Sequence, residues 1–244
     1  MSKCVIFDLD GTIYFGEQIA KYANEILTNL EKLGYEVLFL TNNSTKTREE
    51  ILEKLQGLNI NTSLNKIYTS SYATAKYLDE ISIRNIFLIG TEGFKKELNL
   101  LNINVVDEAK AEAVVIGLDV KFNYEIISRA LIAVNNGSKI IASNKDKNYP
   151  IENGVLRPGS NAILASLLGS CDDKEIDFIA GKPNTYLLEI ICKDFQLHKD
   201  DIYVVGDSLE SDIAMADAYG CKSILVGENS NNLKDVFKII IKEG

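Results

Sequence analysis

Short apolar runs alternate with amphipathic segments along this chain, and the alternation predicts strands followed by helices. The run at 4–7 is typical of a buried strand, and residues 18–33 carry apolar side chains at the spacing of one helix face. The next expected elements are a strand at 35–40, a helix ending near 55, a strand at 66–69 and a helix at 72–78. This βαβα order predicts a parallel, doubly wound sheet.

A second set of units follows, and the first pattern then resumes. The second set comprises strands at 86–89, 103–106, 113–117 and 139–142, with helices near 92–100 and 123–136. A strand at 177–180 is expected to return to the first sheet, with Pro183 in the first turn of the following helix. The last expected elements are a strand at 202–205, a helix at 209–219, a strand at 222–226 and a helix at 232–242.

The composition fits a soluble globular protein with a substantial core, since 46% of its 244 residues are apolar and 25% are charged. The net charge of −9 argues against a broad nucleic-acid surface but leaves room for an anionic substrate beside a cation. No apolar run approaches membrane-spanning length, and no signal-peptide pattern opens the chain. The four cysteines show no CxxC spacing, so we expect free thiols and a reducing, cytoplasmic compartment.

Four polar clusters each follow a predicted strand of the first set. They are Asp8 with Asp10, Thr41 to Ser44, Lys182, and Asp207 to Asp212. In a parallel sheet all four would project from the same carboxyl edge, where ligands bind in open α/β folds. The two acids Asp8 and Asp10 suit a metal-assisted phosphate site, although Asp-Gly is also a common turn pair.

These clusters resemble the motifs of the haloacid dehalogenase-like hydrolases, in particular the NagD-like and 4-nitrophenylphosphatase-like phosphatases. The motifs that carry the resemblance are Asp8-Leu9-Asp10-Gly11-Thr12, Leu40-Thr41-Asn42-Asn43-Ser44, Gly181-Lys182-Pro183 and Gly206-Asp207-Ser208-Leu209-Glu210-Ser211-Asp212. Their order and spacing match across nearly the whole chain, and four separated motifs must coincide to give that match.

The resemblance implies an α/β fold with a Rossmann-like, doubly wound parallel core and an inserted α/β cap that sets substrate specificity. The implied core covers 1–80 and 176–244, and the implied cap covers 81–175. It also implies Mg²⁺-dependent hydrolysis of a small phosphate ester and a homodimer formed through the cap. Neither a nucleic acid nor a membrane is expected as a partner.

The family pattern makes Asp8 the nucleophile, which would split ester hydrolysis through an aspartyl-phosphate. The alternative is that Asp8 only binds metal. Asp10 suits a general acid and base that protonates the leaving oxygen and then activates water. Its alternative is a second metal carboxylate, whereas in the family its backbone carbonyl reaches the metal.

Mg²⁺ prefers a few carboxylates together with water and phosphate oxygens. Asp8, the carbonyl of Asp10, and Asp207 would meet that need. The family pattern makes Asp212 a support for Lys182 or for the metal's waters. Asp212 would also suit a plain helix N-terminus, where an acid is favourable.

The expected phosphate-binding groups are Lys182, Thr41, Asn42 and Asn43. Lys182 would neutralise phosphate oxygens, although a lysine at a strand end is usually a solvated charge. Residues 41–44 would also suit N-capping of the next helix, and both roles are compatible. Tyr149, in the 144–150 loop, is a candidate for stacking on a substrate ring, with an exposed loop tyrosine as the alternative.

Two other functions remain open from the sequence: a non-catalytic phosphate-binding regulatory module, and a phosphotransferase on the same scaffold. The only histidine, His198, lies in a polar stretch and is expected at the surface. A phosphohistidine mechanism or a Ser-His-Asp triad therefore has little support.

Overall fold

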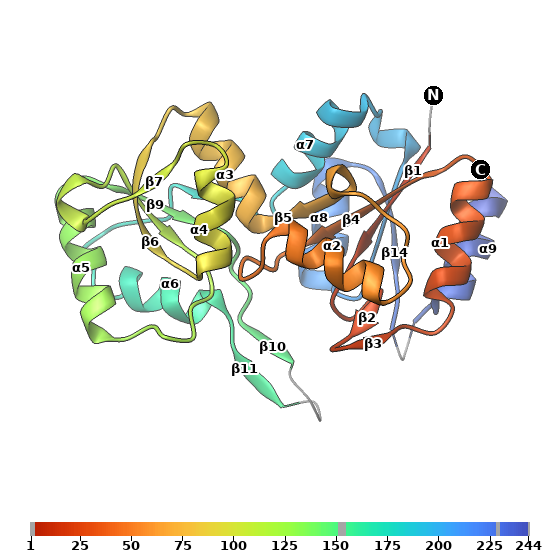
Figure 1. Ribbon diagram of the computed structural model, residues 1–244, viewed down its shortest axis with the longest axis horizontal. Helices are drawn as coiled ribbons and strands as arrows, with labels where there is room; N and C mark the ends of the chain where they lie inside the picture. Colours follow the sequence, from red (N-terminus) through yellow and green to blue (C-terminus); the bar gives the residue numbers. More distant parts are fainter. Residues whose placement is uncertain (1–2, 151–154, 228–229, 244) are drawn as a thin grey trace. The chain divides into compact units, whose positions relative to one another are not determined.

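The chain folds into two compact units, each built around a five-stranded sheet (Figure 1). The computed structural model describes residues 3–150, 155–227 and 230–243. The first unit takes in Met1–Thr41, Glu49–Tyr68 and Lys182–Gly244, and the second takes in Asn42–Arg48 and Thr69–Gly181.

The sheet of the first unit has the strand order β14-β13-β1-β4-β5. Its strands are β1 (Cys4–Asp8), β4 (Glu36–Thr41), β5 (Ile67–Thr69), β13 (Ile202–Gly206) and β14 (Lys222–Leu225). Its helices are α1 (Ala23–Lys32), α2 (Arg48–Gly57), α7 (Tyr186–Phe195), α8 (Ala214–Tyr219) and α9 (Leu233–Glu243). Strand β1 runs parallel to both β13 and β4, with Phe7 opposite Val205 and Phe39. Asp8 and Thr41, which end β1 and β4, and Asp207, which directly follows β13, therefore lie at one edge of the sheet.

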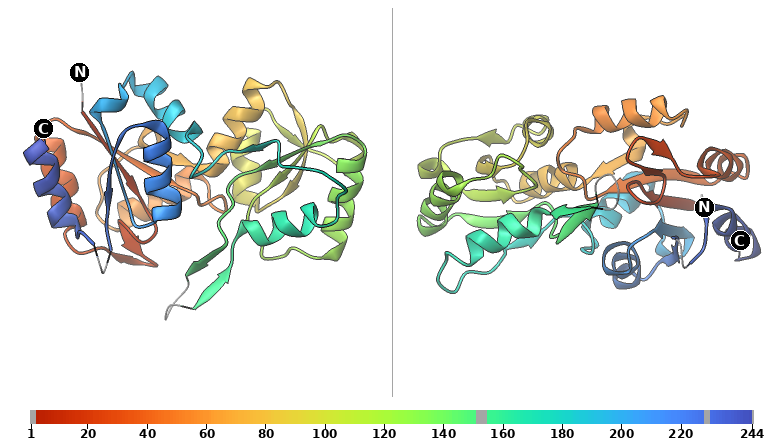
Figure 2. Two further views of the ribbon diagram at one scale, coloured as in Figure 1. Left: turned by 180° about the vertical axis from the view of Figure 1, so that it is seen from behind. Right: turned by 90° about the horizontal axis from the view of Figure 1, so that it is seen from below.

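Strand β1 is at the centre of the core of the first unit and is buried along its whole length. Val5 and Phe7 lie on one face of the strand, since side chains alternate, and they join the same core cluster as the apolar stripes of α1, α2 and α9. Helices α1 and α9 come from opposite ends of the chain and pack side by side (Figures 1 and 2).

The sheet of the second unit has the order β12-β9-β8-β6-β7, and each pair of neighbouring strands is parallel. Its strands are β6 (Asn85–Ile89), β7 (Asn104–Val105), β8 (Ala113–Ile116), β9 (Lys139–Ala142) and β12 (Phe178–Ile179). Its helices are α3 (Ser70–Glu80), α4 (Glu92–Asn99), α5 (Tyr124–Asn135) and α6 (Ser160–Leu168).

Both faces of this second sheet are covered. On β8, Val114 and Ile116 join the cluster that includes α5 and α6, whereas Ala113 and Val115 join the cluster that includes α3 and α4. Continuous apolar strands are typical of parallel sheets with a helix layer on each side. The expected α/β, doubly wound fold class is confirmed.

Several short elements differ from the sequence-based expectations. Hairpins β2–β3 (Tyr14–Phe15, Gln18–Ile19) and β10–β11 (Asn148–Pro150, Leu156–Pro158) were not predicted, because such short strands carry no measurable periodicity. The strand expected to precede Lys182 in the first sheet is β12, which pairs with β9 in the second sheet, so that prediction is wrong. Helix α7 begins at Tyr186, so Pro183 precedes the helix instead of opening it.

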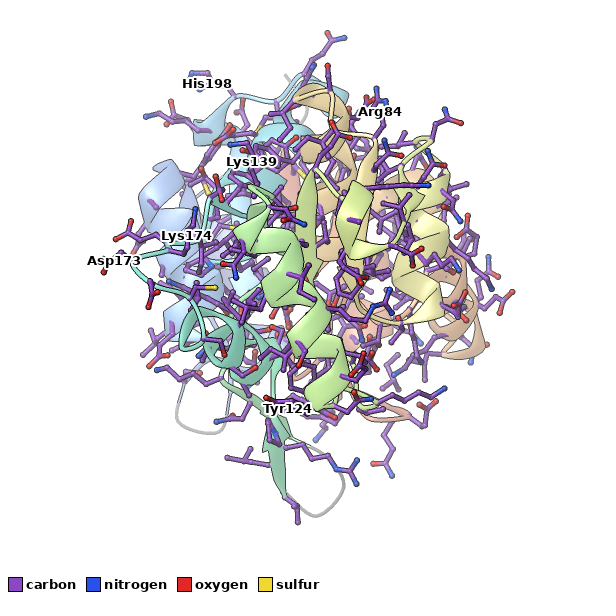
Figure 3. The ribbon with its side chains drawn as sticks, turned by 90° about the vertical axis from the view of Figure 1, so that its left-hand side faces the viewer. Arg84, Tyr124, Lys139, Asp173, Lys174 and His198 are labelled. Carbon is purple, nitrogen blue, oxygen red and sulfur yellow. The ribbon has the colours of Figure 1, made fainter. Side chains whose placement is uncertain are left out.

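The surface of the described residues is rich in charge, with Arg84, Lys139 and Asp173 on its exterior (Figure 3). His198 is exposed there and pairs with Asp200 at 3.2 Å, which confirms the expected surface position of the only histidine. Within the described part of the chain, no helix combines the length and the apolar character needed to cross a membrane.

The segment 42–48, which follows β4, is held to the rest of the second unit by an ion pair with α4. Glu97 is 1% exposed and accepts hydrogen bonds from the backbone N–H of Arg48 at 2.7 Å and from its Nε at 3.2 Å. The Arg48 guanidinium also lies 3.8 Å from the centre of the Tyr72 ring. The Thr91 hydroxyl donates to the carbonyl of Thr45 at 2.7 Å.

Replacing Glu97 with Ala is expected to lower the free energy of unfolding by about 3 kcal/mol, because it leaves the Arg48 charge poorly compensated. Urea denaturation would measure the change. Lys95→Ala on the same helix removes only an exposed ion pair with Glu92 and should change the free energy by no more than about 0.5 kcal/mol. Equal effects of the two substitutions would contradict the anchoring role of Glu97.

Candidate active site

Four charged side chains converge at the carboxyl edge of the first sheet: Asp8, Lys182, Asp207 and Asp212. Asp8 is the last residue of β1, and Asp207 directly follows β13. Asp212 lies on a π-helical turn, Leu209–Ile213, that leads into α8. Lys182 is the first residue of the chain's return to this unit.

Lys182 forms the centre of the cluster. Its side chain is 3% exposed, and its Nζ donates to Asp8 Oδ1 at 2.6 Å and to Asp212 Oδ1 at 2.5 Å. Burial alone would lower the pKa of Lys182, but the carboxylates of Asp212 and Asp8 outweigh it and raise that pKa above its ordinary value. The two hydrogen-bonded acids therefore favour the cationic form of Lys182.

Asp212 is fixed in place through both of its carboxylate oxygens. Oδ1 accepts from Lys182, and Oδ2 accepts from the backbone N–H of Ser208 at 3.1 Å. A Cβ at Gly206 would overlap with the Asp212 carboxyl group, so the glycine is needed for this close approach. Asp212 thus orients Lys182 with no carboxylate oxygen left uncommitted.

Asp8 is buried, and only one of its carboxylate oxygens is bonded to protein. Oδ1 accepts from Lys182, whereas Oδ2 has no hydrogen-bond partner among the described residues. Burial raises the pKa of Asp8; Lys182 opposes this shift, and the Asp212 charge adds to it. A buried carboxylate oxygen without a partner is costly unless a ligand or ion satisfies it.

Carboxylate oxygens of Asp8, Asp207 and Asp212 lie within 4.8 Å of one another. Partial desolvation and the Asp212 charge raise the pKa of Asp207. Gly11, at φ +91°, lets Asp207 approach the first motif, because a Cβ there would overlap with the Asp207 carboxylate. An oxygen-only, acidic donor set with one unsatisfied buried oxygen fits a hard divalent cation such as Mg²⁺.

Asp10 is not one of the three acids grouped above, and its side chain contacts Tyr14. It is exposed, and its Oδ2 accepts a hydrogen bond from the Tyr14 hydroxyl at 3.3 Å. The sequence did not single out Tyr14. Its position four residues after Asp10 could have indicated that the two residues are close, because a tight turn brings such residues together.

The residues expected to bind phosphate from the second motif have well-defined local partners. Thr41, the last residue of β4, is buried. The Asn42 side chain donates to Asp146 Oδ1 at 2.9 Å, and Asn43 Oδ1 accepts from the backbone N–H and the hydroxyl of Thr45. These bonds orient both amides. Binding of phosphate by Thr41, Asn42 and Asn43 stays a prediction.

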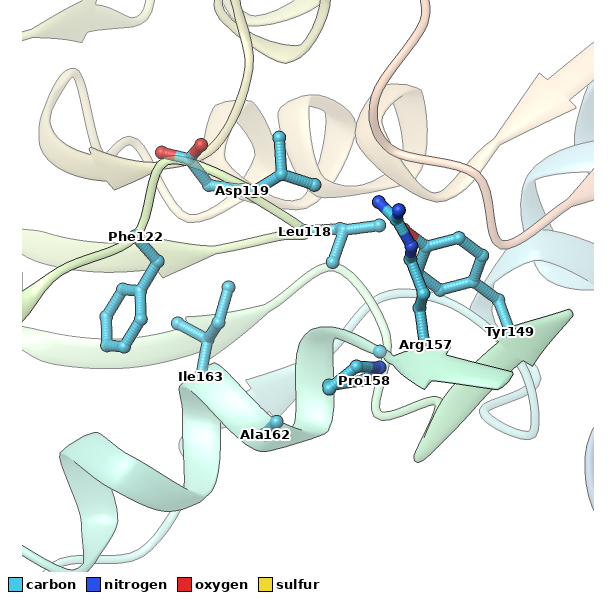
Figure 4. Close-up of a pocket in the computed structure, with 10 residues that line it drawn as sticks. Leu118, Asp119, Phe122, Tyr149, Arg157, Pro158, Ala162 and Ile163 are labelled. Atoms are coloured by element: carbon cyan, nitrogen blue, oxygen red, sulfur yellow. The ribbon is translucent and has the colours of Figure 1, made fainter. Parts of the chain in front are cut away.

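Tyr149 lines a cavity of about 330 Å³ in the second unit (Figure 4). Tyr149 on β10 pairs across the hairpin with Arg157 on β11, and both contribute to the wall. Apolar side chains line much of the remainder, among them Leu118, Phe122 and Ile163. A role of Tyr149 in substrate binding stays a prediction.

Two sequence families match the chain. Residues 5–104 match a family described as haloacid dehalogenase-like hydrolase, and residues 179–242 match a HAD-hydrolase-like family. These ranges include all four motifs and the four charged residues of the cluster.

Similar proteins cover nearly the whole chain. The sugar-phosphatase AraL of Bacillus subtilis (strain 168) is 33% identical over 228 residues, which are 91% of this chain and 82% of the relative. A p-nitrophenyl phosphatase from Archaeoglobus fulgidus superposes with a TM-score of 0.88 at 30% identity, covering 99% of this chain and 92% of the other. A glycerol phosphate phosphatase from Mycobacterium tuberculosis, solved in complex with magnesium, gives a TM-score of 0.84 at 28% identity, covering 94% and 69%. The chain therefore belongs to the haloacid dehalogenase-like hydrolases, as one of their NagD-like phosphatases.

Proposed function

We propose that this enzyme is a Mg²⁺-dependent phosphatase that hydrolyses small phosphomonoesters through an aspartyl-phosphate on Asp8. The observation that carries the proposal is the state of the Asp8 carboxylate. One oxygen is held by Lys182, and the other is buried beside Asp207 and Asp212 with no hydrogen-bond partner in the part of the chain that the structure describes.

Asp8 is suited to attack phosphorus because its position is already fixed. The bond from Lys182 to Oδ1 orients the carboxylate, so that one of its oxygens can attack phosphorus while the other faces the cation. The Lys182 ammonium also neutralises charge that builds up on the phosphoryl oxygens. Asp212 keeps the lysine in place through its own bond at 2.5 Å.

Asp10 would act in both halves of the reaction. It would first give a proton to the leaving oxygen, and then take one from the water that cleaves the aspartyl-phosphate. The Tyr14 hydroxyl holds its Oδ2, so the carboxylate has a defined orientation.

Asp8, the backbone carbonyl of Asp10, and Asp207 would hold the Mg²⁺ ion. When bound, the ion supplies positive charge that screens the acids from the phosphate and polarises its oxygens. Asp212 is assigned a supporting role, because both its carboxylate oxygens already accept hydrogen bonds.

Substrate selection would come from the second unit. The core expected at 1–80 and 176–244 and the cap expected at 81–175 differ at their edges from the two compact units, because α3 and β12 lie in the second unit. We assign catalysis to the first unit and substrate specificity to the second, with Tyr149 as a contact for the leaving group. Thr41, Asn42 and Asn43 would bind the remaining phosphate oxygens. The names of similar proteins, which mention sugar, glycerol phosphate and p-nitrophenyl substrates, support a small phosphate ester as substrate.

A reducing, cytoplasmic location agrees with the four free cysteines of the chain. A homodimer formed through the cap is proposed from the family resemblance alone, and measurement of the mass in solution would test it.

Asp8→Asn is expected to lower turnover of 4-nitrophenyl phosphate at least about 1,000-fold, because the amide is not a nucleophile. Asp200→Asn, at the exposed partner of His198, is the matched control and should leave turnover unchanged. In acid-quenched wild-type enzyme, peptide mass spectrometry should find the phosphoryl group on Asp8.

Near-normal turnover by Asp8→Asn would contradict the proposal. A wild-type protein that binds Mg²⁺ but turns over none of a broad panel of phosphate esters would favour a non-catalytic phosphate-binding module instead. Transfer of the phosphoryl group to sugars in preference to water would favour a phosphotransferase.

Removal of divalent ions with EDTA should abolish turnover, and added Mg²⁺ should restore it. Asp207→Asn should raise the Mg²⁺ concentration that gives half-maximal activity by about tenfold to a hundredfold, because it replaces an anionic ligand. Asp217→Asn, at an exposed acid on α8, provides the control and should leave the Mg²⁺ requirement unchanged. An unaltered requirement in Asp207→Asn would remove this residue from the metal site.

A further inference from the structure

The turn after β1 brings Tyr14 back beside Asp10. The backbone N–H of Gly11 donates to the carbonyl of Tyr14 at 2.9 Å, and the N–H of Tyr14 donates to the carbonyl of Leu9 at 3.2 Å. The phenol hydroxyl then reaches Asp10 Oδ2 at 3.3 Å. Backbone and side chain together therefore join residues 10 and 14.

The Tyr14 ring is held on several sides. It is 2% exposed and belongs to the core cluster of the first unit. The Lys54 ammonium, from α2, lies 3.7 Å from the ring centre, which is the geometry of a cation–π contact. The strand pair β2–β3 places Tyr14 opposite Ile19. These contacts restrain the ring and therefore the position of its phenol oxygen.

Asp10, in contrast to the buried Tyr14, is exposed. An exposed aspartate samples several rotamers, and a general acid must present its proton within a narrow range of distance and angle. A hydrogen bond from an immobile donor selects one orientation of the carboxyl group. Because the phenol donates to Oδ2, a proton on this carboxyl group would sit on Oδ1.

We propose that Tyr14 is a positioning residue for Asp10, whose phenol hydroxyl fixes the carboxyl group that protonates the leaving oxygen. The inference rests on the acid role proposed above for Asp10. Tyr14 acts on the reaction only through Asp10, and Lys54 restrains the ring that carries the hydroxyl.

The test compares two aryl esters of similar shape, phenyl phosphate and 4-nitrophenyl phosphate. Phenolate is the more basic leaving group and needs the proton, whereas nitrophenolate leaves readily without it. Tyr14→Phe keeps the buried ring and removes only the hydroxyl. We expect kcat/KM for phenyl phosphate to fall about tenfold, and kcat/KM for 4-nitrophenyl phosphate to change no more than about twofold.

The matched control is Tyr68→Phe, which removes another phenol-to-carboxylate bond in the same unit. The Tyr68 hydroxyl, from β5, donates to Asp194 Oδ2 at 2.9 Å. Its removal should leave kcat/KM for both esters unchanged. A loss of similar size for both esters in Tyr14→Phe, or no loss for either, would overturn the proposal. Thermal melting of each variant separates a folding defect from a kinetic one.

Asp10→Asn separates this inference from the proposed function. If Asp10→Asn impairs phenyl phosphate more than 4-nitrophenyl phosphate and Tyr14→Phe does not, only the role of Tyr14 is wrong. If Asp10→Asn shows no such selectivity, the acid role of Asp10 is wrong, and the inference about Tyr14 falls with it.

Discussion

The arrangement of charged side chains at the carboxyl edge of the first sheet depends on the ammonium group of Lys182, which is buried between Asp8 and Asp212. Three carboxylates gather there, and without a cation they would repel one another and any phosphate ester. Lys182 lies 2.6 Å from Asp8 and 2.5 Å from Asp212, so its single positive charge is shared between two of the three carboxylates. A buried group of this kind contributes little net stability when intact, but loss of one member leaves an uncompensated charge. This arrangement is therefore better explained by the proposed reaction than by a gain in folding stability.

Two glycines make this concentration of charge sterically feasible. Gly11 and Gly206 each occupy a position where a Cβ would overlap with an acid, Asp207 in one case and Asp212 in the other. Each glycine follows or ends a buried parallel strand, and the strands bring the two motifs to the same edge of the sheet. Backbone clearance and strand register together set the distances on which the chemistry depends.

Much of this arrangement could be predicted from the chain. Apolar runs at β1 and β13 end in acids, and parallel pairing brings such ends together, so the approach of Asp8 to Asp207 follows from pattern alone. The sheet that receives β12 could not be predicted, because two apolar residues pair equally well with an edge strand of either sheet. Lys182 was thus expected for the wrong reason: it reaches Asp8 from the segment after a strand of the second sheet.

The sequence places Tyr14 close to Asp10 in a tight turn, but the hydrogen bond between them could not be predicted because it depends on the direction of a side chain. Hairpins of two or three residues per strand were missed because they are too short to show alternation. The roles of Thr41, Asn42, Asn43 and Tyr149 stay predictions, because the contacts of Asn42 and Asn43 are with neighbouring protein groups and binding of phosphate is a property of the complex.

The most direct test of the central claim is a crystal structure of the enzyme grown with Mg²⁺ and beryllofluoride, a mimic of a phosphoryl group on aspartate. We expect beryllium to bond to a carboxylate oxygen of Asp8, Lys182 to contact the fluorides, and Mg²⁺ to contact both Asp8 and Asp207. Beryllofluoride on another side chain, or Mg²⁺ bound away from these acids, would contradict the central claim.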